Sequence, residues 1–133
     1  MPAKSKLSLT LCLVTGGRDY NDIGHVFDCL THLDKSFARL VVIHGDAPGA
    51  DTLCGDTCTA AGIEFVAVPA AWKKFKRAAG PIRNQLMLDL FPNIDLVLAF
   101  PGGTGTADMK KRAGKMGIDI IESRDLLVNQ PTL

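Results

Sequence analysis

Short apolar runs alternate along this chain with segments of helical spacing, and most of the runs end in a turn rich in glycine or proline. Such an alternation requires crossover connections between parallel strands, with helices on both faces of one sheet. We therefore expect an α/β, doubly wound fold with three layers and a mainly parallel five-stranded sheet in the order 3-2-1-4-5. The expected strands span residues 7–14, 40–44, 63–68, 94–100 and 118–121.

Capping residues and helix breakers place helices between these strands. Asn21 or Asp22 is suited to cap the first helix, and Asp51 to cap the second, which is expected to end near Gly62. The third and fourth helices are expected over residues 81–90 and 107–116, because proline is tolerated in a first helical turn and glycine follows the last segment. Residues 123–133 are expected to form a tail beyond a core of about residues 7–122.

Length and composition fit one domain without a membrane anchor. Two separate cores would be marginally small in 133 residues, and a hydrophobic content of 47% is ordinary for a globular protein. A net charge of +1 supplies no field that by itself attracts nucleic acid or a membrane. No apolar stretch is long enough to cross a bilayer, and the basic residues 1–6 lack a small-residue cleavage site, so we expect a cytoplasmic protein.

The four cysteines occur at spacings that match no zinc finger or redox motif. Cys54 and Cys58 would share one face of a helix, as two metal ligands would, but no second pair of ligands accompanies them. Because cysteine is among the most buried residue types, we interpret Cys12, Cys29, Cys54 and Cys58 as reduced core residues. We expect no metal site and no resident cofactor.

The loops at residues 15–18 and 101–106 are expected to face one crevice. In a doubly wound sheet, ligands bind beyond the carboxyl ends of the strands where the strand order reverses, here between the first and fourth strands. Glycines let main-chain amides approach an anion, and the following helix directs its positive end to the same place. Thr104, Thr106 and Arg18 add hydrogen-bond donors suited to a phosphate. The alternative is that both loops are merely tight turns.

Neither of two common nucleotide-binding patterns occurs in the sequence. The first loop reads Gly-Gly-Arg-Asp rather than G-x-G-x-x-G, and no G-x-x-x-x-G-K-[ST] is found. ATP hydrolysis of the P-loop kind is therefore not supported.

Four ordered motifs resemble those of the SLOG superfamily, and more narrowly those of its YspA-like branch of uncharacterised bacterial and phage proteins. They lie at residues 15–18 (TGGR), 44–51 (HGDAPGAD), 80–85 (GPIRNQ) and 101–109 (PGGTGTADM). The resemblance implies a Rossmann-like fold, self-association as a dimer or tetramer, and binding of a nucleotide or nucleotide-derived ligand. The superfamily includes the LOG phosphoribohydrolases, the DNA-processing protein A family, and sensor domains for signals related to ADP-ribose.

One departure from the family pattern weakens the case for hydrolase activity. The hydrolase motif P-G-G-x-G-T-x-x-E ends in a glutamate that assists loss of the base, and this chain has Met109 there. A thioether neither takes a proton nor stabilises an oxocarbenium ion. Asp108 is one step away, about 100° around a helix, and is better suited to bond a ligand hydroxyl. Arg83 matches an arginine that SLOG enzymes bring towards the ligand, so Asp108 and Arg83 are the catalytic candidates if the chain is an enzyme.

Several further residues have both a ligand-binding and a structural interpretation. Asp46 and Asp51 suit ribose hydroxyls, or else an Asx turn and an N-cap. Trp72, beside the basic residues 73–77, suits stacking on a base, or else anchoring of a surface loop. Asn84 lies with Arg83 either beside the crevice or at a solvated helix start. The candidate ligand-binding residues are Thr15, Gly16, Gly17, Arg18, Gly45, Asp46, Asp51, Trp72, Arg83, Asn84, Pro101, Gly102, Gly103, Thr104, Gly105, Thr106 and Asp108.

We expect the chain to bind a nucleotide-derived small molecule without turnover, as a sensor or a phage sponge of a signalling nucleotide. A nucleoside 5′-monophosphate phosphoribohydrolase of the LOG type is the alternative. Single-stranded nucleic-acid binding through the basic segment of residues 73–83 is a second alternative. The expected partners are the small molecule and further copies of the chain, with nucleic acid less favoured and no membrane.

Overall fold

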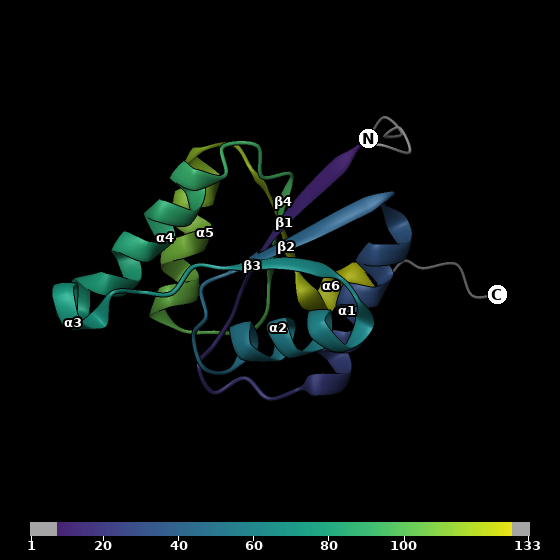
Figure 1. Cartoon of the computed structure of the whole chain (residues 1–133), viewed down its shortest axis with the longest axis horizontal. Helices are drawn as coiled ribbons and strands as arrows, with labels where there is room; N and C mark the ends of the chain where they lie inside the picture. Colours follow the sequence, from purple (N-terminus) through teal and green to yellow (C-terminus); the bar gives the residue numbers. More distant parts are fainter. Residues whose placement is uncertain (1–7, 129–133) are drawn as a thin grey trace.

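All five strands pair in parallel, in the order β3-β2-β1-β4-β5 (Figure 1). The computed structural model describes residues 8–128, so residues 1–6, Leu7 and the end of the expected tail lie outside the described residues. The Rossmann-like α/β fold and the strand order predicted from the sequence are confirmed. The strands are β1 (Leu9–Thr15), β2 (Arg39–His44), β3 (Glu64–Ala67), β4 (Leu96–Ala99) and β5 (Asp119–Glu122).

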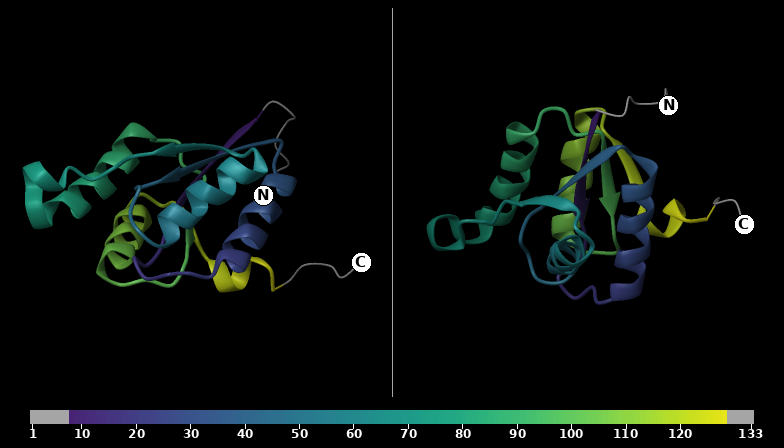
Figure 2. Two further views of the ribbon diagram at one scale, coloured as in Figure 1. Left: turned by 60° about the horizontal axis from the view of Figure 1, so that its bottom comes forward. Right: turned by 45° about the vertical axis from the view of Figure 1, so that its right-hand side comes forward.

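Helices cover both faces of the sheet, which gives three layers (Figure 2). α1 and α2 pack on one face with the short α6, and α4 and α5 pack on the other. No helix within residues 8–128 has the length and apolar character needed to span a bilayer. The helices are α1 (Ile23–Ser36), α2 (Ala50–Ala61), α3 (Trp72–Phe75), the 3-10 turn η1 (Lys76–Ala78), α4 (Ala79–Leu90), α5 (Thr104–Lys115) and α6 (Ser123–Leu126).

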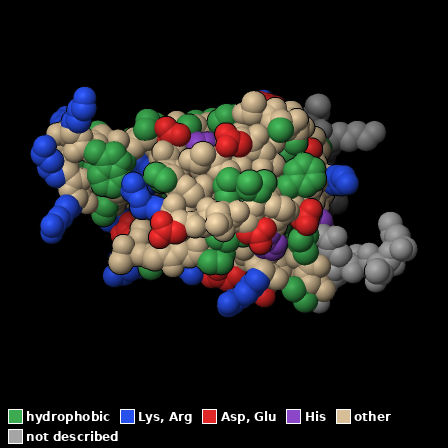
Figure 3. Space-filling model, turned by 90° about the horizontal axis from the view of Figure 1, so that it is seen from below, with side chains coloured by type: hydrophobic (Ala, Val, Ile, Leu, Met, Phe, Trp, Pro, Cys, Tyr) green, Lys and Arg blue, Asp and Glu red, His purple; other side chains and the backbone are tan. Residues whose placement is uncertain are grey.

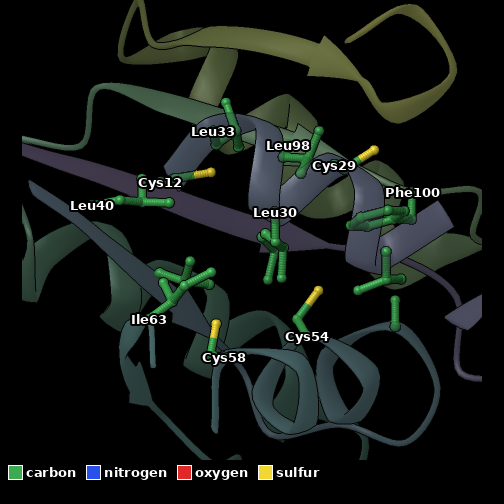
Figure 4. Close-up of a cluster of buried hydrophobic side chains, with 14 of the residues drawn as sticks. Cys12, Cys29, Leu30, Leu33, Leu40, Cys54, Cys58, Ile63, Leu98 and Phe100 are labelled. Atoms are coloured by element: carbon green, nitrogen blue, oxygen red, sulfur yellow. The ribbon is translucent and has the colours of Figure 1, made fainter. Parts of the chain in front are cut away.

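The four cysteines belong to the core between the sheet and helices α1 and α2 (Figure 4). All four are fully buried and none forms a disulfide, which confirms their interpretation as reduced core residues. Burial raises the pKa of Cys12 and of Cys58 to about 12, so both thiols stay protonated and unreactive. Within the described residues, no group of three or more His, Cys, Asp and Glu side chains is arranged to hold a metal.

Two of the predicted helix caps are confirmed and one is wrong. Asp22 caps α1 by accepting a hydrogen bond from the amide of His25 at 3.1 Å, and Gly62 ends α2 with a φ of +73°. Asp51 is not an N-cap, because α2 begins at Ala50 and Gly49 occupies the N-cap position. The carboxylate of Asp51 turns back instead and accepts hydrogen bonds from two amides of the preceding loop.

Helical structure also extends further than the sequence predicts. α5 begins at Thr104 rather than near Ala107, so tertiary packing overrides the low helix propensity of Gly105. Residues 72–78 form α3 and η1, which were not predicted. Within the expected tail, the structure forms α6, whose Ser123 is 2% exposed, and Leu126 and Leu127 pack against the core.

Candidate functional site

The two glycine-rich loops meet at the carboxyl ends of β1 and β4. Thr15 pairs with Ala99 in the sheet, and the amide of Gly17 donates to the carbonyl of Pro101 at 2.8 Å. A Cβ atom at Gly17 would lie 3.0 Å from that carbonyl oxygen and 3.1 Å from the Cα of Gly102. Close packing of the loops therefore favours glycine at position 17, whatever the loops bind.

A cavity of about 610 Å³, the large cavity, opens between these loops and α4. Its volume lies within the range of small-molecule sites, roughly 300–1,000 Å³. The structure brings most of the predicted site residues together in its wall. These are Thr15, Gly16, Gly17, Arg18, Asp51, Trp72, Arg83, Asn84, Gly103, Thr104, Gly105, Thr106 and Asp108.

The remaining predicted residues lie near the large cavity but do not line it. The guanidinium of Arg83 covers Gly45 and donates a hydrogen bond to its carbonyl. Asp46 is exposed, with a φ of +55°. Pro101 and Gly102 face the first loop and hold it in place.

The wall also contains residues that the sequence did not single out. Met87 lies one helical turn after Arg83 on α4, so helical spacing is the signal that identifies it. Asp19 follows Arg18 directly in the first loop. Ala47 lies in the loop between β2 and α2. The others lie in η1 and the first turn of α4, whose position depends on the unpredicted α3. The full set of additional residues is Asp19, Ala47, Arg77, Gly80, Pro81 and Met87.

The N-terminus of α5 opens into the large cavity, because residues 103–106 line it. Among the described residues, no side chain caps this helix. Its first main-chain bond joins the amide of Ala107 to the carbonyl of Gly103 at 3.0 Å, so the amides of residues 104–106 have no partner within the helix. Amides without a helical partner and the positive end of the helix dipole together favour an anion at this position.

A hydrogen-bond network positions Arg83 in the wall of the large cavity. Its Nε donates to Oδ1 of Asn84 at 3.0 Å, and its Nη1 donates to the carbonyl of Gly45. The buried amide of Asn84 donates in turn to the carbonyl of Gly105 at 3.3 Å and to Oδ2 of Asp108 at 2.9 Å. Burial lowers the pKa of Arg83, but an arginine stays charged. The network therefore joins the loop after β2, α4 and α5 around a fixed positive charge.

Asp108 contributes an ionised carboxylate to the large cavity. Burial acts to raise its pKa, but hydrogen bonds from Arg112 and Asn84 and the charge of Arg112 outweigh burial and lower the pKa. Both of these bonds are to Oδ2, with Arg112 at 2.8 Å, and Oδ1 has no partner in the described part of the chain. Asp108 is therefore suited to accept a hydrogen bond from a ligand hydroxyl and is a weak base.

Met109, at the position of the hydrolase glutamate, is fully buried. Its side chain packs in the core between α5 and the sheet, with Leu13 and Val97 in the same cluster. It is not part of the wall of the large cavity and offers a bound ligand no charged or polar group.

An aromatic ring and two arginines form another part of the wall. Trp72 is 46% exposed, and the guanidinium of Arg18 lies 5.5 Å from the centroid of its ring. Arg77 lines the same cavity. Lys and Arg side chains gather at the end of the molecule where α3 lies (Figure 3). An exposed indole flanked by cations suits stacking on a base that carries phosphates.

Two buried titratable groups, His44 and Asp51, flank the loop after β2. His44 is 3% exposed and accepts a hydrogen bond at Nδ1 from the amide of Asp46 at 2.9 Å. Its Nε2 has no hydrogen-bond partner within residues 8–128. Burial lowers the pKa of His44 and raises the pKa of Asp51, despite the two amides that bond this carboxylate.

Stability is expected to fall as the pH drops below the ordinary histidine pKa of 6.5. The unfolded chain binds a proton at that value, whereas the folded chain keeps His44 neutral to a lower pH, so protons favour unfolding. Well above pH 6.5, His44 is neutral in both the folded and the unfolded chain, so the stability it contributes is fully present. Urea unfolding of the wild type and of His44→Gln at about pH 5.5 and about pH 7.5 measures this effect. An unchanged pH dependence in His44→Gln would contradict the assignment.

Thr106 buries a hydroxyl group that has no hydrogen-bond partner among the described residues, and the residue is only 5% exposed. The oxygen faces Gly102 so closely that a Cβ atom there would overlap with it. Because an unpaired buried hydroxyl costs about 1–3 kcal/mol, we expect Thr106→Val to raise the free energy of unfolding by about 1 kcal/mol. Urea denaturation measures the change, and a clear loss of stability would show that the hydroxyl is bonded in solution.

The fold and the cavity define a Rossmann-like α/β protein with a large cavity at the topological switch point, where ligands bind in folds of this class. Residues 10–75 match YAcAr, the YspA, cpYpsA-related SLOG family. The Gene 61 protein of Mycobacterium phage D29 is 36% identical over 121 residues, which cover 85% of this chain and 95% of that protein. The chain belongs to the SLOG superfamily, in its YspA- and cpYpsA-related family.

Among solved structures, DNA processing protein A (DprA) from Streptococcus pneumoniae shares the fold, with a TM-score of 0.69. The match covers 88% of this chain at 18% sequence identity. The chain spans about half of that protein, 51% of its length. At this identity the likeness shows the fold alone.

Proposed function

We propose that this chain binds a nucleotide-derived small molecule in the large cavity, either a nucleoside phosphate or an ADP-ribose-like or cyclic nucleotide signal. The observation that carries the proposal is the uncapped N-terminus of α5, which opens into a cavity whose wall also holds Arg83. Helix N-terminal amides and an arginine fork are the donors that phosphate oxygens require. Membership of a SLOG family supports a nucleotide ligand.

Each part of such a ligand has a chemically suitable partner in the wall. The phosphate fits the amides of residues 104–106 together with Arg83. The ribose hydroxyls fit Oδ1 of Asp108, which has no partner among residues 8–128. The base fits the exposed face of Trp72, and Arg18 and Arg77 suit a further phosphate group beside it.

Binding without turnover is supported by the same geometry. Met109 is buried in the core, and the lowered pKa of Asp108 makes it neither a proton donor near pH 7 nor a strong base. Hydrolysis of the LOG type therefore lacks the glutamate of its motif. Chromatography of nucleoside monophosphates incubated with the protein should show no free base. Base release above the protein-free control would restore the phosphoribohydrolase alternative.

The likeness to a mycobacteriophage protein supports a role in phage biology. A protein that holds a signalling nucleotide without cleaving it lowers the free concentration of that signal. We therefore favour a sponge or a sensor of a signalling nucleotide.

Isothermal titration calorimetry against AMP, ADP-ribose, cyclic ADP-ribose isomers and cyclic dinucleotides tests the proposal. At least one of these ligands is expected to bind with saturable heat. Absence of binding by all of them at millimolar concentration would remove the proposal.

Self-association is supported by the outer face of α4. Ile82, Leu86 and Leu90 recur every four residues and are 41%, 42% and 55% exposed. Residues at this spacing form one stripe along a helix, and a contiguous apolar surface commonly marks an interface. Sedimentation equilibrium should show a dimer or tetramer, and a monomer at every concentration would contradict this.

Single-stranded nucleic acid is the second candidate ligand, and α3 is the observation that favours it. Lys73, Lys74 and Lys76 are exposed around Trp72, which is the combination that non-specific single-strand binders use. Binding of labelled oligonucleotides should then weaken steeply with salt. A flat salt response, or no binding, removes this candidate.

A further inference from the structure

A second hollow of about 310 Å³, the small hollow, lies beside the large cavity. Gly103 and Thr106 belong to the walls of both, so this part of the glycine-rich loop separates the two spaces. Phe100 and Ser123 line only the small hollow, which places it at the carboxyl ends of β4 and β5. None of the site residues predicted from the sequence, apart from residues 101–103 and Thr106, belongs to it.

Among the described residues that face the small hollow, one cation has no ion-pair partner. Lys110 and Glu122 form an ion pair at 2.9 Å, with side chains 36% and 35% exposed. Arg124 also lines the small hollow and has no ion-pair partner within residues 8–128. The wall therefore carries a net positive charge centred on a guanidinium.

The hydroxyl of Thr106 provides a second and independent observation. Its oxygen is buried in the wall between the two spaces and has no hydrogen-bond partner among the described residues. Buried polar groups in folded proteins are nearly always paired, and a bound group is one of the explanations for an exception. Valine would fill the same space without burying an unpaired hydroxyl group.

We infer that the small hollow binds the phosphate group of a second small molecule, separately from the ligand of the large cavity. Arg124 supplies the planar fork that bonds two phosphate oxygens at once, and the hydroxyl of Thr106 supplies a further donor. Lys110 shares its charge between Glu122 and the phosphate. The volume lies at the lower limit of small-molecule sites, so a small phosphate compound fits better than a complete nucleotide.

Amide NMR spectra of the full chain, recorded during titration with inorganic phosphate, test this inference. The amides of Phe100 and Ser123, which line only the small hollow, are expected to shift in a saturable way. Arg124→Gln should weaken the apparent affinity at these two amides by about tenfold or more, because it removes a charged hydrogen-bond donor. Thr106→Val should weaken it in the same direction.

Lys115→Gln is the matched control, because it removes the same charge from α5 at a position outside both walls. Its affinity at Phe100 and Ser123 should stay within about twofold of the wild type. The inference is overturned if these amides do not shift, or if Arg124→Gln and Lys115→Gln behave alike. Gly16 and Gly80 line only the large cavity, so their shifts test the nucleotide site separately.

Discussion

Replacement of Gly49 by alanine is expected to lower the free energy of unfolding by about 3 kcal/mol or more. A backbone region that residues other than glycine rarely adopt costs alanine about 1–3 kcal/mol, and overpacking costs about 1–3 kcal/mol. Gly49 has a φ of +80° at the N-cap of α2. A Cβ atom there would collide with the carbonyl oxygen of Gly17 and lie 2.5 Å from the carbonyl carbon of Arg18. These are main-chain atoms, so α2 or the loop after β1 has to move.

Gly62→Ala is the matched control for this prediction. Gly62 also has a positive φ, +73°, and its ψ of 27° places it in the left-handed helical region. Nothing lies within 4 Å of the Cβ atom added there. Only the conformational cost of about 1–2 kcal/mol is therefore expected. Urea denaturation of both variants measures the added cost at Gly49, which combines the close contact with a backbone conformation that alanine adopts less readily than that of Gly62. Equal destabilisation would show that the contact between α2 and the first loop is not tight.

Arg83→Gln is expected to weaken the tightest nucleotide ligand by about 30-fold or more, because truncating one partner of a buried charged pair costs about 2–5 kcal/mol. The side chain already donates from Nε to Asn84 and from Nη1 to Gly45, so its remaining N–H groups, two of them on Nη2, are available to a ligand in the large cavity that Arg83 lines. Arg83→Lys should fall between the wild type and Arg83→Gln, because lysine keeps the charge but loses the fork.

Lys35→Gln removes an equal charge from the last turn of α1, on the opposite face of the sheet, and serves as the control. Its nucleotide affinity should match that of the wild type. Calorimetry gives the affinities, and urea denaturation checks that each variant is folded. An unchanged affinity in Arg83→Gln would place the ligand elsewhere.

The strand order could be predicted from the sequence because parallel strands are buried on both faces and so read as continuous apolar runs. β2 shows this most clearly, since five of its six residues are buried. Right-handed crossovers and short connections then leave few topologies. The crevice between β1 and β4 follows from that order and not from any single motif.

The details of the site depend on contacts that no local pattern contains. Asp51 was expected at a helix cap, but its carboxylate bonds the loop before α2. Gly45 was expected to face a ligand, but Arg83, from a helix distant in sequence, covers it. α3 was missed because four residues are too few to show a helical period. As a result, the contribution of Arg77 and Gly80 to the large cavity was not predicted.

The central claim is that a nucleotide phosphate binds at the N-terminus of α5, and amide NMR during titration with the tightest calorimetric ligand tests it most directly. The amides of Thr104, Gly105 and Thr106 are predicted to show the largest shifts, and to saturate with the affinity that calorimetry gives. Unmoved amides at residues 104–106, with the largest shifts in α3 or on the face covered by α1, would contradict the claim.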